Sequence, residues 1–185
     1  MAAFDLEEQE QLDALKAWWK RWGNYVIYGL SAVLIAVTGW QYWKNHTAKQ
    51  SGEAAAHFES MSIALEAGDM KTAREQGALL VDKYGRTPYA TRAAMLVASI
   101  NVQGKDIKSA RAQLQWVVES TKEAALRDVA CLRLAGILLD EKDYEGALKQ
   151  LNAAHTDAYA ARFDDIKGDV YLAQGKTAEA RAAYS

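Results

Sequence analysis

The sequence predicts an all-α protein in which one transmembrane helix near the amino terminus is followed by a solenoid of stacked helical hairpins. Three observations support this fold class. Residues 22–43 form an apolar stretch without a charged side chain. The chain of 185 residues contains one proline and is rich in Ala, Leu, Lys and Glu, which favour helices. A short polar motif also recurs at nearly constant spacing after the apolar stretch, which is typical of helical repeats.

The stretch 22–43 has the length and the residue distribution of a membrane-spanning helix. At a rise of ~1.5 Å per residue it extends about 33 Å, enough to cross a hydrocarbon layer of ~30 Å. Aromatic side chains gather at both ends, where we expect four of them to act as interfacial anchors: Trp22, Trp40, Tyr42 and Trp43. The bulky sequence GWQYWKNH at the end is unsuited to cleavage by signal peptidase, so we interpret the stretch as an uncleaved anchor.

The charges that flank this stretch favour a cytoplasmic amino terminus. Three basic residues lie just before it, and two, Lys44 and Lys49, follow within the next 15 residues. We therefore expect residues 1–21 to form a short cytoplasmic tail and residues 44–185 to form an exported repeat domain. In a bacterium with two membranes, this places a single-pass protein in the inner membrane with its carboxy-terminal domain in the periplasm.

Composition excludes some classes of function for the exported domain. The chain has a net charge of −2, and the first 21 residues carry five acidic and three basic side chains, which leaves the remainder neutral. Binding to phosphate backbones requires a basic surplus, so nucleic acid is not an expected partner. The lone Cys131 cannot form an internal disulfide.

Four hexapeptides after the apolar stretch share one template: GDMKTA, KDIKSA, KDYEGA and GKTAEA. They end at Ala73, Ala110, Ala147 and Ala180, with spacings of 37, 37 and 33 residues. A period in the thirties, with a polar turn between two apolar helical segments, predicts stacked helical hairpins.

The positions around each closing alanine fit the same frame. Four residues later, on the same helical face, the copies have Gly77, Leu114, Leu151 and Tyr184. Twelve residues earlier, where the two helices of a hairpin would approach closely, they have Met61, Ala98, Ala135 and Gly168. The last copy is the most regular, and the pattern resembles tetratricopeptide repeats.

This frame predicts the helices 48–66, 70–84, 88–102, 106–120, 122–140, 143–155, 160–174 and 177 onward, with the spanning helix continuing into the first of them. Repeat arrays need a closing helix with a polar outer face. Because the chain stops at Ser185, we expect the array to be incomplete at its carboxy end, with Leu172 and Tyr184 near the open side.

The sequence contains no pattern of residues that predicts catalysis, cofactor binding or a metal site. The histidines and the cysteine lack the spacing of metal ligands: His46, His57, His155 and Cys131. No glycine-rich phosphate loop follows a strand, and Gly136 and Gly146 are explained by helix packing and turn geometry. A nucleophile with a positioned base is not visible either, so we do not expect an enzyme.

Two interaction surfaces are expected instead. A solenoid of hairpins presents a concave face that suits peptide segments or unfolded chains. Within the apolar stretch, small residues recur on one helical face, which lets another transmembrane helix approach closely: Gly29, Ala32, Ala36 and Gly39. The alternative is that Gly and Ala are simply common in spanning helices.

Together these parts resemble a known family, the ancillary subunits of the bacterial SecYEG translocon. The resemblance covers the whole chain and includes the acidic amino-terminal tail, the patch LKAWWKRWGN (15–24), the span ending in GWQYWKNH and the stretch YGRTPYATRAAMLVA (84–98). It implies a non-enzymatic inner-membrane protein beside the Sec translocon subunits, together with a membrane-anchored periplasmic chaperone. It also implies unfolded or secreted polypeptides as partners and a role in an envelope stress phosphorelay.

The second hypothesis is structural. The chain would be a self-associating scaffold or a regulatory adaptor in another cell-envelope assembly, with the small-residue face making a homo-oligomer. The two hypotheses differ in what contacts that face.

Overall fold

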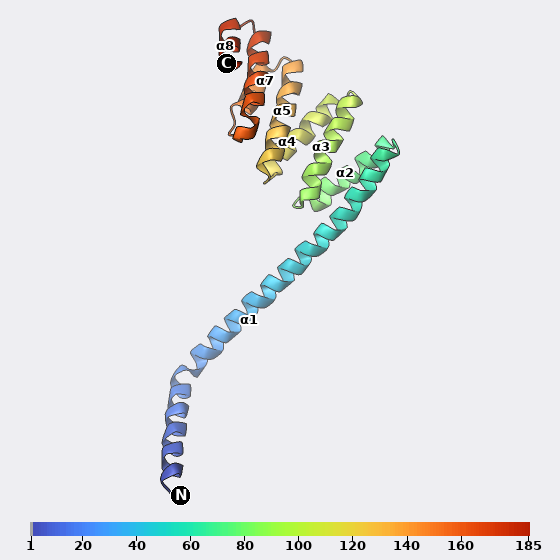
Figure 1. Cartoon of the computed structure of the whole chain (residues 1–185). Helices are drawn as coiled ribbons and strands as arrows, with labels where there is room; N and C mark the ends of the chain where they lie inside the picture. The colour runs from blue at the N-terminus through green and yellow to red at the C-terminus, as the bar shows by residue number, and fades with distance from the viewer. Residues whose placement is uncertain (1) are drawn as a thin grey trace. The chain divides into compact units, whose positions relative to one another are not determined.

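The computed structural model describes the backbone of residues 2–185 and the side chains of residues 11–185 (Figure 1). Over this range the secondary structure consists of helices only, so the predicted all-α fold is confirmed. The elements are α1 (Ala2–Glu66), α2 (Met70–Tyr84), α3 (Pro88–Gln103), α4 (Ile107–Ser120), α5 (Ala124–Asp140), α6 (Tyr144–Leu151), the 3₁₀ helix η1 (Asp157–Tyr159), α7 (Ala160–Ala173) and α8 (Thr177–Ala183).

The chain divides into two compact units, of which one ends at Lys49 and the other comprises Gln50–Ser185. Helix α1 contributes to both units, because the apolar helix continues without a break into the first repeat, as predicted. In the second unit, each helix from α2 to α8 packs against the next one along the chain (Figure 1). The boundaries 1–21, 22–43 and 44–185 refer to a membrane and stay predictions.

One predicted helix, 143–155, is too long. Helix α6 ends at Leu151 because the segment that follows is held against α5. The buried carboxylate of Asp128 accepts hydrogen bonds from the backbone N–H and the hydroxyl of Thr156, at 3.0 and 2.6 Å. These bonds satisfy a buried charge and draw the chain out of the helix before η1.

The repeated hexapeptide forms the same turn in all four copies. Its first residue has a left-handed backbone, with φ of 75° at Gly68, 61° at Lys105, 62° at Lys142 and 76° at Gly175. The backbone N–H of the next residue donates to a carbonyl five residues earlier, as from Asp69 to Ala64 at 2.8 Å. This is the usual way in which a helix ends on a left-handed residue, and it reverses the chain within a few residues.

The second residue of the motif then begins the next helix. In three copies it is an aspartate whose carboxylate accepts a backbone N–H bond: Asp69 from Thr72 at 3.0 Å, Asp106 from Ser109 at 3.1 Å and Asp143 from Gly146 at 3.0 Å. The fourth copy has Lys176 here, and α8 begins without a side-chain cap.

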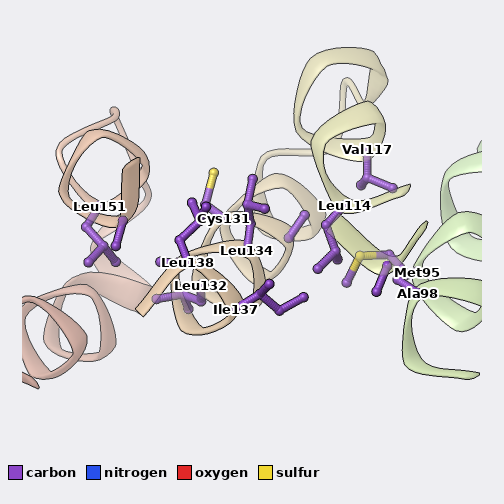
Figure 2. Packing of buried hydrophobic residues seen from close by; sticks show 14 of the residues in the cluster. Met95, Ala98, Leu114, Val117, Cys131, Leu132, Leu134, Ile137, Leu138 and Leu151 are labelled. Atoms are coloured by element: carbon purple, nitrogen blue, oxygen red, sulfur yellow. The ribbon is translucent and has the colours of Figure 1, made fainter. Parts of the chain in front are cut away.

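The alanines and their partner positions form the core of the repeat domain. Of the twelve residues singled out around the four motifs, all are buried except Tyr184. Figure 2 shows the larger cluster extending from Met95 on α3 through Leu114 on α4 and Leu134 on α5 to Leu151 on α6. A second cluster joins the end of α1 to α2 and α3.

Two glycines mark the closest helix contacts. A Cβ atom added at Gly77 would collide with the Val97 side chain, and one at Gly168 would collide with the ring of Tyr184. The Tyr184 hydroxyl donates to Asp169 at 2.7 Å, and this bond, with desolvation, raises the pKa of Tyr184 to about 12. The small residues thus lie where the repeat frame requires them.

Polar contacts also join the last turns of α1 to α2. The Tyr84 hydroxyl donates to Glu53 at 3.0 Å, and the His57 ring nitrogen Nδ1 lies 2.9 Å from the Gln76 side-chain oxygen. The ring of Tyr84 packs near that of His57, with centroids 5.6 Å apart. These contacts make the end of α1 the first helix of the first hairpin.

The left-handed backbone conformation of Lys105 and Lys142 predicts that glycine at such a position stabilises the domain. Lys142→Gly removes an L-residue cost of about 1–2 kcal/mol and adds a backbone-entropy cost of about 0.5–1 kcal/mol, so we expect a gain in stability of up to about 1.5 kcal/mol. Urea denaturation of the purified chain measures it. The matched control, Lys149→Gly within α6, should lose about 1 kcal/mol because its backbone is helical. Equal losses in both variants would contradict the turn geometry.

The capping carboxylates predict a dependence of stability on pH. The Thr72 hydroxyl and backbone N–H hold the pKa of Asp69 below its ordinary value, and Ser109 acts in the same way on the pKa of Asp106. Their contribution is therefore fully present above the unfolded pKa of ~3.9 and is lost as the pH falls through the lower folded values.

An Asp69→Ala, Asp106→Ala double variant tests this dependence. At pH 6 it should be clearly less stable than the parent chain, and the difference should narrow at pH 3. Denaturation midpoints at the two pH values provide the measurement. A difference that stays constant would show that the charge of the caps contributes nothing.

Candidate functional site

Helix α1 contains the one segment, within the described part of the chain, that is long and apolar enough to cross a membrane. Only 6 % of its most apolar run of 18 residues is buried, whereas the core helix of a soluble domain is mostly buried. The predicted anchors Trp22, Trp40, Tyr42 and Trp43 are all exposed. Rings pair along the helix at both ends, Trp22 with Tyr25 and Trp40 with Trp43, each with centroids 5.8 Å apart.

The small-residue face of α1 lies on the helix surface. Gly29, Ala32, Ala36 and Gly39 are exposed, and a Cβ atom added at either glycine would meet no atom within 4 Å. The hydroxyl of Thr38 donates to the carbonyl of Leu34 at 2.8 Å and is thereby satisfied within the helix. The four small residues therefore leave this side of α1 exposed and without bulky side chains at their positions.

The repeat domain contains a mostly apolar depression of about 290 Å³ between α3 and α5, which we call the α3–α5 hollow. Helix α4 contributes Leu114 at its base. The remaining lining residues come in two groups, Ala98, Ser99 and Val102 from α3 and Arg133, Gly136, Ile137 and Asp140 from α5. Val102 is 42 % exposed, although its side chain is apolar. Figure 2 labels Ala98, Leu114 and Ile137 among the residues of the buried cluster.

Gly136 lines the hollow without contributing a side chain. A Cβ atom added there would meet nothing within 4 Å, so the interpretation that helix packing requires this glycine is wrong. Gly146 does fit turn geometry, because a Cβ atom there would lie 2.5 Å from the capping carboxylate of Asp143. A glycine in mid-helix lowers stability by about 1 kcal/mol relative to alanine. At position 136 no close packing contact offsets this loss, and the space beside the glycine is open.

Two opposite charges flank Gly136 on α5. Arg133 precedes it by three residues and Asp140 follows it by four, and both are exposed on the wall of the hollow. Neither forms an ion pair with another described residue. Other charged side chains of the domain do: Arg92 contacts Glu123 at 3.2 Å, and Arg111 contacts Glu141 at 3.0 Å.

The described residues show no arrangement suited to metal or nucleophilic chemistry. From residue 11 onward, no group of three or more His, Cys, Asp or Glu side chains could hold a metal ion. Burial raises the pKa of the Cys131 thiol, with the charge of Asp128 acting in the same direction, so the thiol stays protonated. The hollow can therefore bind, through apolar contact and two charges, but has no group positioned for covalent chemistry.

The residues that line the hollow were not predicted from the sequence, although a signal was present. Arg133, Gly136 and Asp140 lie at i, i+3 and i+7, on one face of a helix that is otherwise apolar on most sides. A glycine between two charges on the exposed face of such a helix is the pattern that could have indicated a binding surface.

The stacked helical hairpins define a helical repeat protein, and comparison with known proteins identifies its family. The family model of the tetratricopeptide repeat-like domain matches residues 16–185, so the chain belongs to this family. A crystal structure of BtubC (BKLC) from P. vanneervenii has a TM-score of 0.57 and 16 % sequence identity, covering 70 % of this chain and 59 % of that one. This similarity shows the fold alone.

Curated homologues carry the name Ancillary SecYEG translocon subunit, which confirms the resemblance. The homologue from Aggregatibacter actinomycetemcomitans is 28 % identical over 182 residues, or 98 % of this chain and 89 % of its own length. The homologue from Haemophilus influenzae is 30 % identical over 95 residues, or 50 % of this chain and 45 % of its own length.

The open space at Gly136 predicts opposite effects of one substitution at two glycines. Gly136→Ala should raise the free energy of unfolding by about 0.5–1 kcal/mol, because a helical glycine is replaced without a clash. Gly77→Ala should lower it by about 1–3 kcal/mol, because the new methyl group overlaps the buried, stiff Val97 side chain. Thermal unfolding followed by circular dichroism measures both, and a loss at both positions would show that the hollow is filled.

Proposed function

We propose that the chain is a non-enzymatic, membrane-anchored subunit that associates with the Sec translocon and presents its repeat domain to polypeptides. The observation that carries this proposal is the similarity to an ancillary SecYEG translocon subunit over 98 % of the chain. It includes the apolar helix as well as the repeats, so both parts of the homologue have a counterpart here.

In this proposal α1 spans the inner membrane once, with a cytoplasmic amino terminus and a periplasmic repeat domain. The apolar, exposed 22–43 stretch and the aromatic residues at its two ends support the span. The larger number of basic residues before the span supports the orientation.

The small-residue face of α1 is the proposed contact with translocon helices. Gly29 and Gly39 leave the helix backbone open to close approach, and Ala32 and Ala36 add little bulk between them. In a bilayer, where apolar burial does not drive helices together, this kind of face favours association through van der Waals contact.

The α3–α5 hollow is the proposed contact with polypeptides that emerge from the channel. Its apolar base and its two charges without ion-pair partners suit segments that are not yet folded. A membrane-anchored periplasmic chaperone, implied by the sequence resemblance, would act on the same polypeptides beside this domain.

Photo-crosslinking from the α1 face tests the association in intact membranes. A photoreactive amino acid at position 36 should give adducts with translocon subunits, identified by mass spectrometry. The matched control is position 34, because Leu34 lies on the opposite side of the helix from the centre of the small-residue face. Adducts should be several-fold fewer there. Ala36→Leu should also reduce co-purification of translocon subunits.

Two outcomes would contradict the proposal. Adducts of position 36 only with a second copy of the chain would favour the homo-oligomeric scaffold. Lipid adducts alone, equal from positions 34 and 36, would show that the face has no protein partner.

A further inference from the structure

We propose that the α3–α5 hollow selects an extended polypeptide segment in which an acidic residue precedes or follows a basic residue by three positions, with apolar side chains between them. The acidic side chain pairs with Arg133, the basic one with Asp140, and an apolar side chain enters the space over Gly136. This inference rests on the proposed function, since the segment belongs to a polypeptide received by the repeat domain.

The size of the hollow limits the shape of its occupant. A helix with its side chains is ~10–12 Å across, so a single turn or two would exceed a volume of about 290 Å³. One or two apolar side chains of an extended chain fit it. Val102, Ile137 and Leu114 supply the apolar surface that such side chains would cover, and the exposed part of Val102 would become buried.

Because Gly136 has no side chain, an apolar side chain of the bound segment can lie over this position. Gly136 lies in mid-helix, without a packing neighbour that requires it. A side chain of the occupant can therefore reach the backbone of α5 at this position. Any larger residue at position 136 would fill the same volume from the protein side.

The charges set the spacing of the motif. Arg133 and Asp140 are seven residues apart, which along a helix corresponds to ~10.5 Å. An extended chain rises ~3.3 Å per residue, so residues three positions apart span about the same distance. Arginine suits a carboxylate because its planar guanidinium donates two parallel bonds, and Asp140 suits a lysine or arginine in turn.

The opposite signs of Arg133 and Asp140 also disfavour segments that carry two charges of the same sign. A segment with two acidic residues would place one of them beside Asp140, and a segment with two basic residues would place one beside Arg133. Ser99 on the opposite wall offers a hydroxyl that can bond to the backbone of the occupant without selecting its sequence. Selectivity therefore comes from the order and spacing of unlike charges around an apolar centre.

Fluorescence anisotropy with labelled peptides tests this proposal on the full chain in detergent micelles. The probe peptides have the sequences GSDLFKSG and GSKLFDSG, one for each chain direction, with GSDLFDSG, GSKLFKSG and GSDKLFSG as mismatched peptides. One of the first two should bind roughly three- to tenfold more tightly than every mismatched peptide, as expected for two partly exposed ion pairs.

Variants separate the two parts of the hollow. Gly136→Leu should weaken binding of all the peptides at least tenfold while circular dichroism shows an intact fold. The double variant Arg133→Asp, Asp140→Arg should exchange the preferences of the two direction probes, a result that mere unfolding would not give. Lys149→Asp, a charge reversal at an exposed position on α6, is the control. It should change neither the affinity for the peptides nor the preference between the two direction probes.

The outcomes distinguish this inference from the proposed function. Peptides that bind without a charge preference, or equally well to Gly136→Leu, would overturn the inference. A helical peptide that binds more tightly than the extended probes would overturn it too. If these results accompany translocon adducts from position 36, the proposed function stands and the motif alone is wrong. A confirmed motif without such adducts would leave the hollow as described and overturn the association with the translocon.

Discussion

The repeat domain depends on the left-handed residue with which the first helix of each hairpin ends. At Gly68, Lys105, Lys142 and Gly175 the backbone turns in the same sense, and the following residue begins the second helix. Two lysines adopt this conformation despite its cost for an L-residue. The gain that offsets this cost is the placement of the closing alanine, five residues further on, in the interface between the two helices.

From this shared turn follows the close packing of the domain. Because each hairpin reverses in the same way, the small residues of its two helices meet at one level, and the buried cluster continues from hairpin to hairpin (Figure 2). The α3–α5 hollow is the exception. There Gly136 contributes no side chain and no neighbour fills the space, so the domain has a depression where its frame would allow a larger residue.

The sequence predicted the helices well wherever periodicity and turn residues agreed. The range 70–84 coincides with α2, and the buried positions around each motif lie where the repeat frame placed them. The predicted end of α6 was wrong because Asp128, from a different helix, accepts hydrogen bonds from the backbone N–H and the hydroxyl of Thr156. The predicted role of Gly136 in helix packing was wrong because packing against a glycine depends on neighbours that are distant in sequence.

The sequence by itself determined the all-α class, the apolar helix and the four turns, because these depend on local backbone preferences and on the burial of apolar residues at a fixed period. The tertiary structure decided which small residues are close contacts and which leave open space. Gly77 and Gly136 are both glycines in helices, yet Val97 lies against one and nothing lies against the other. That difference is set by side chains that the fold brings together across helices, and no local pattern contains it.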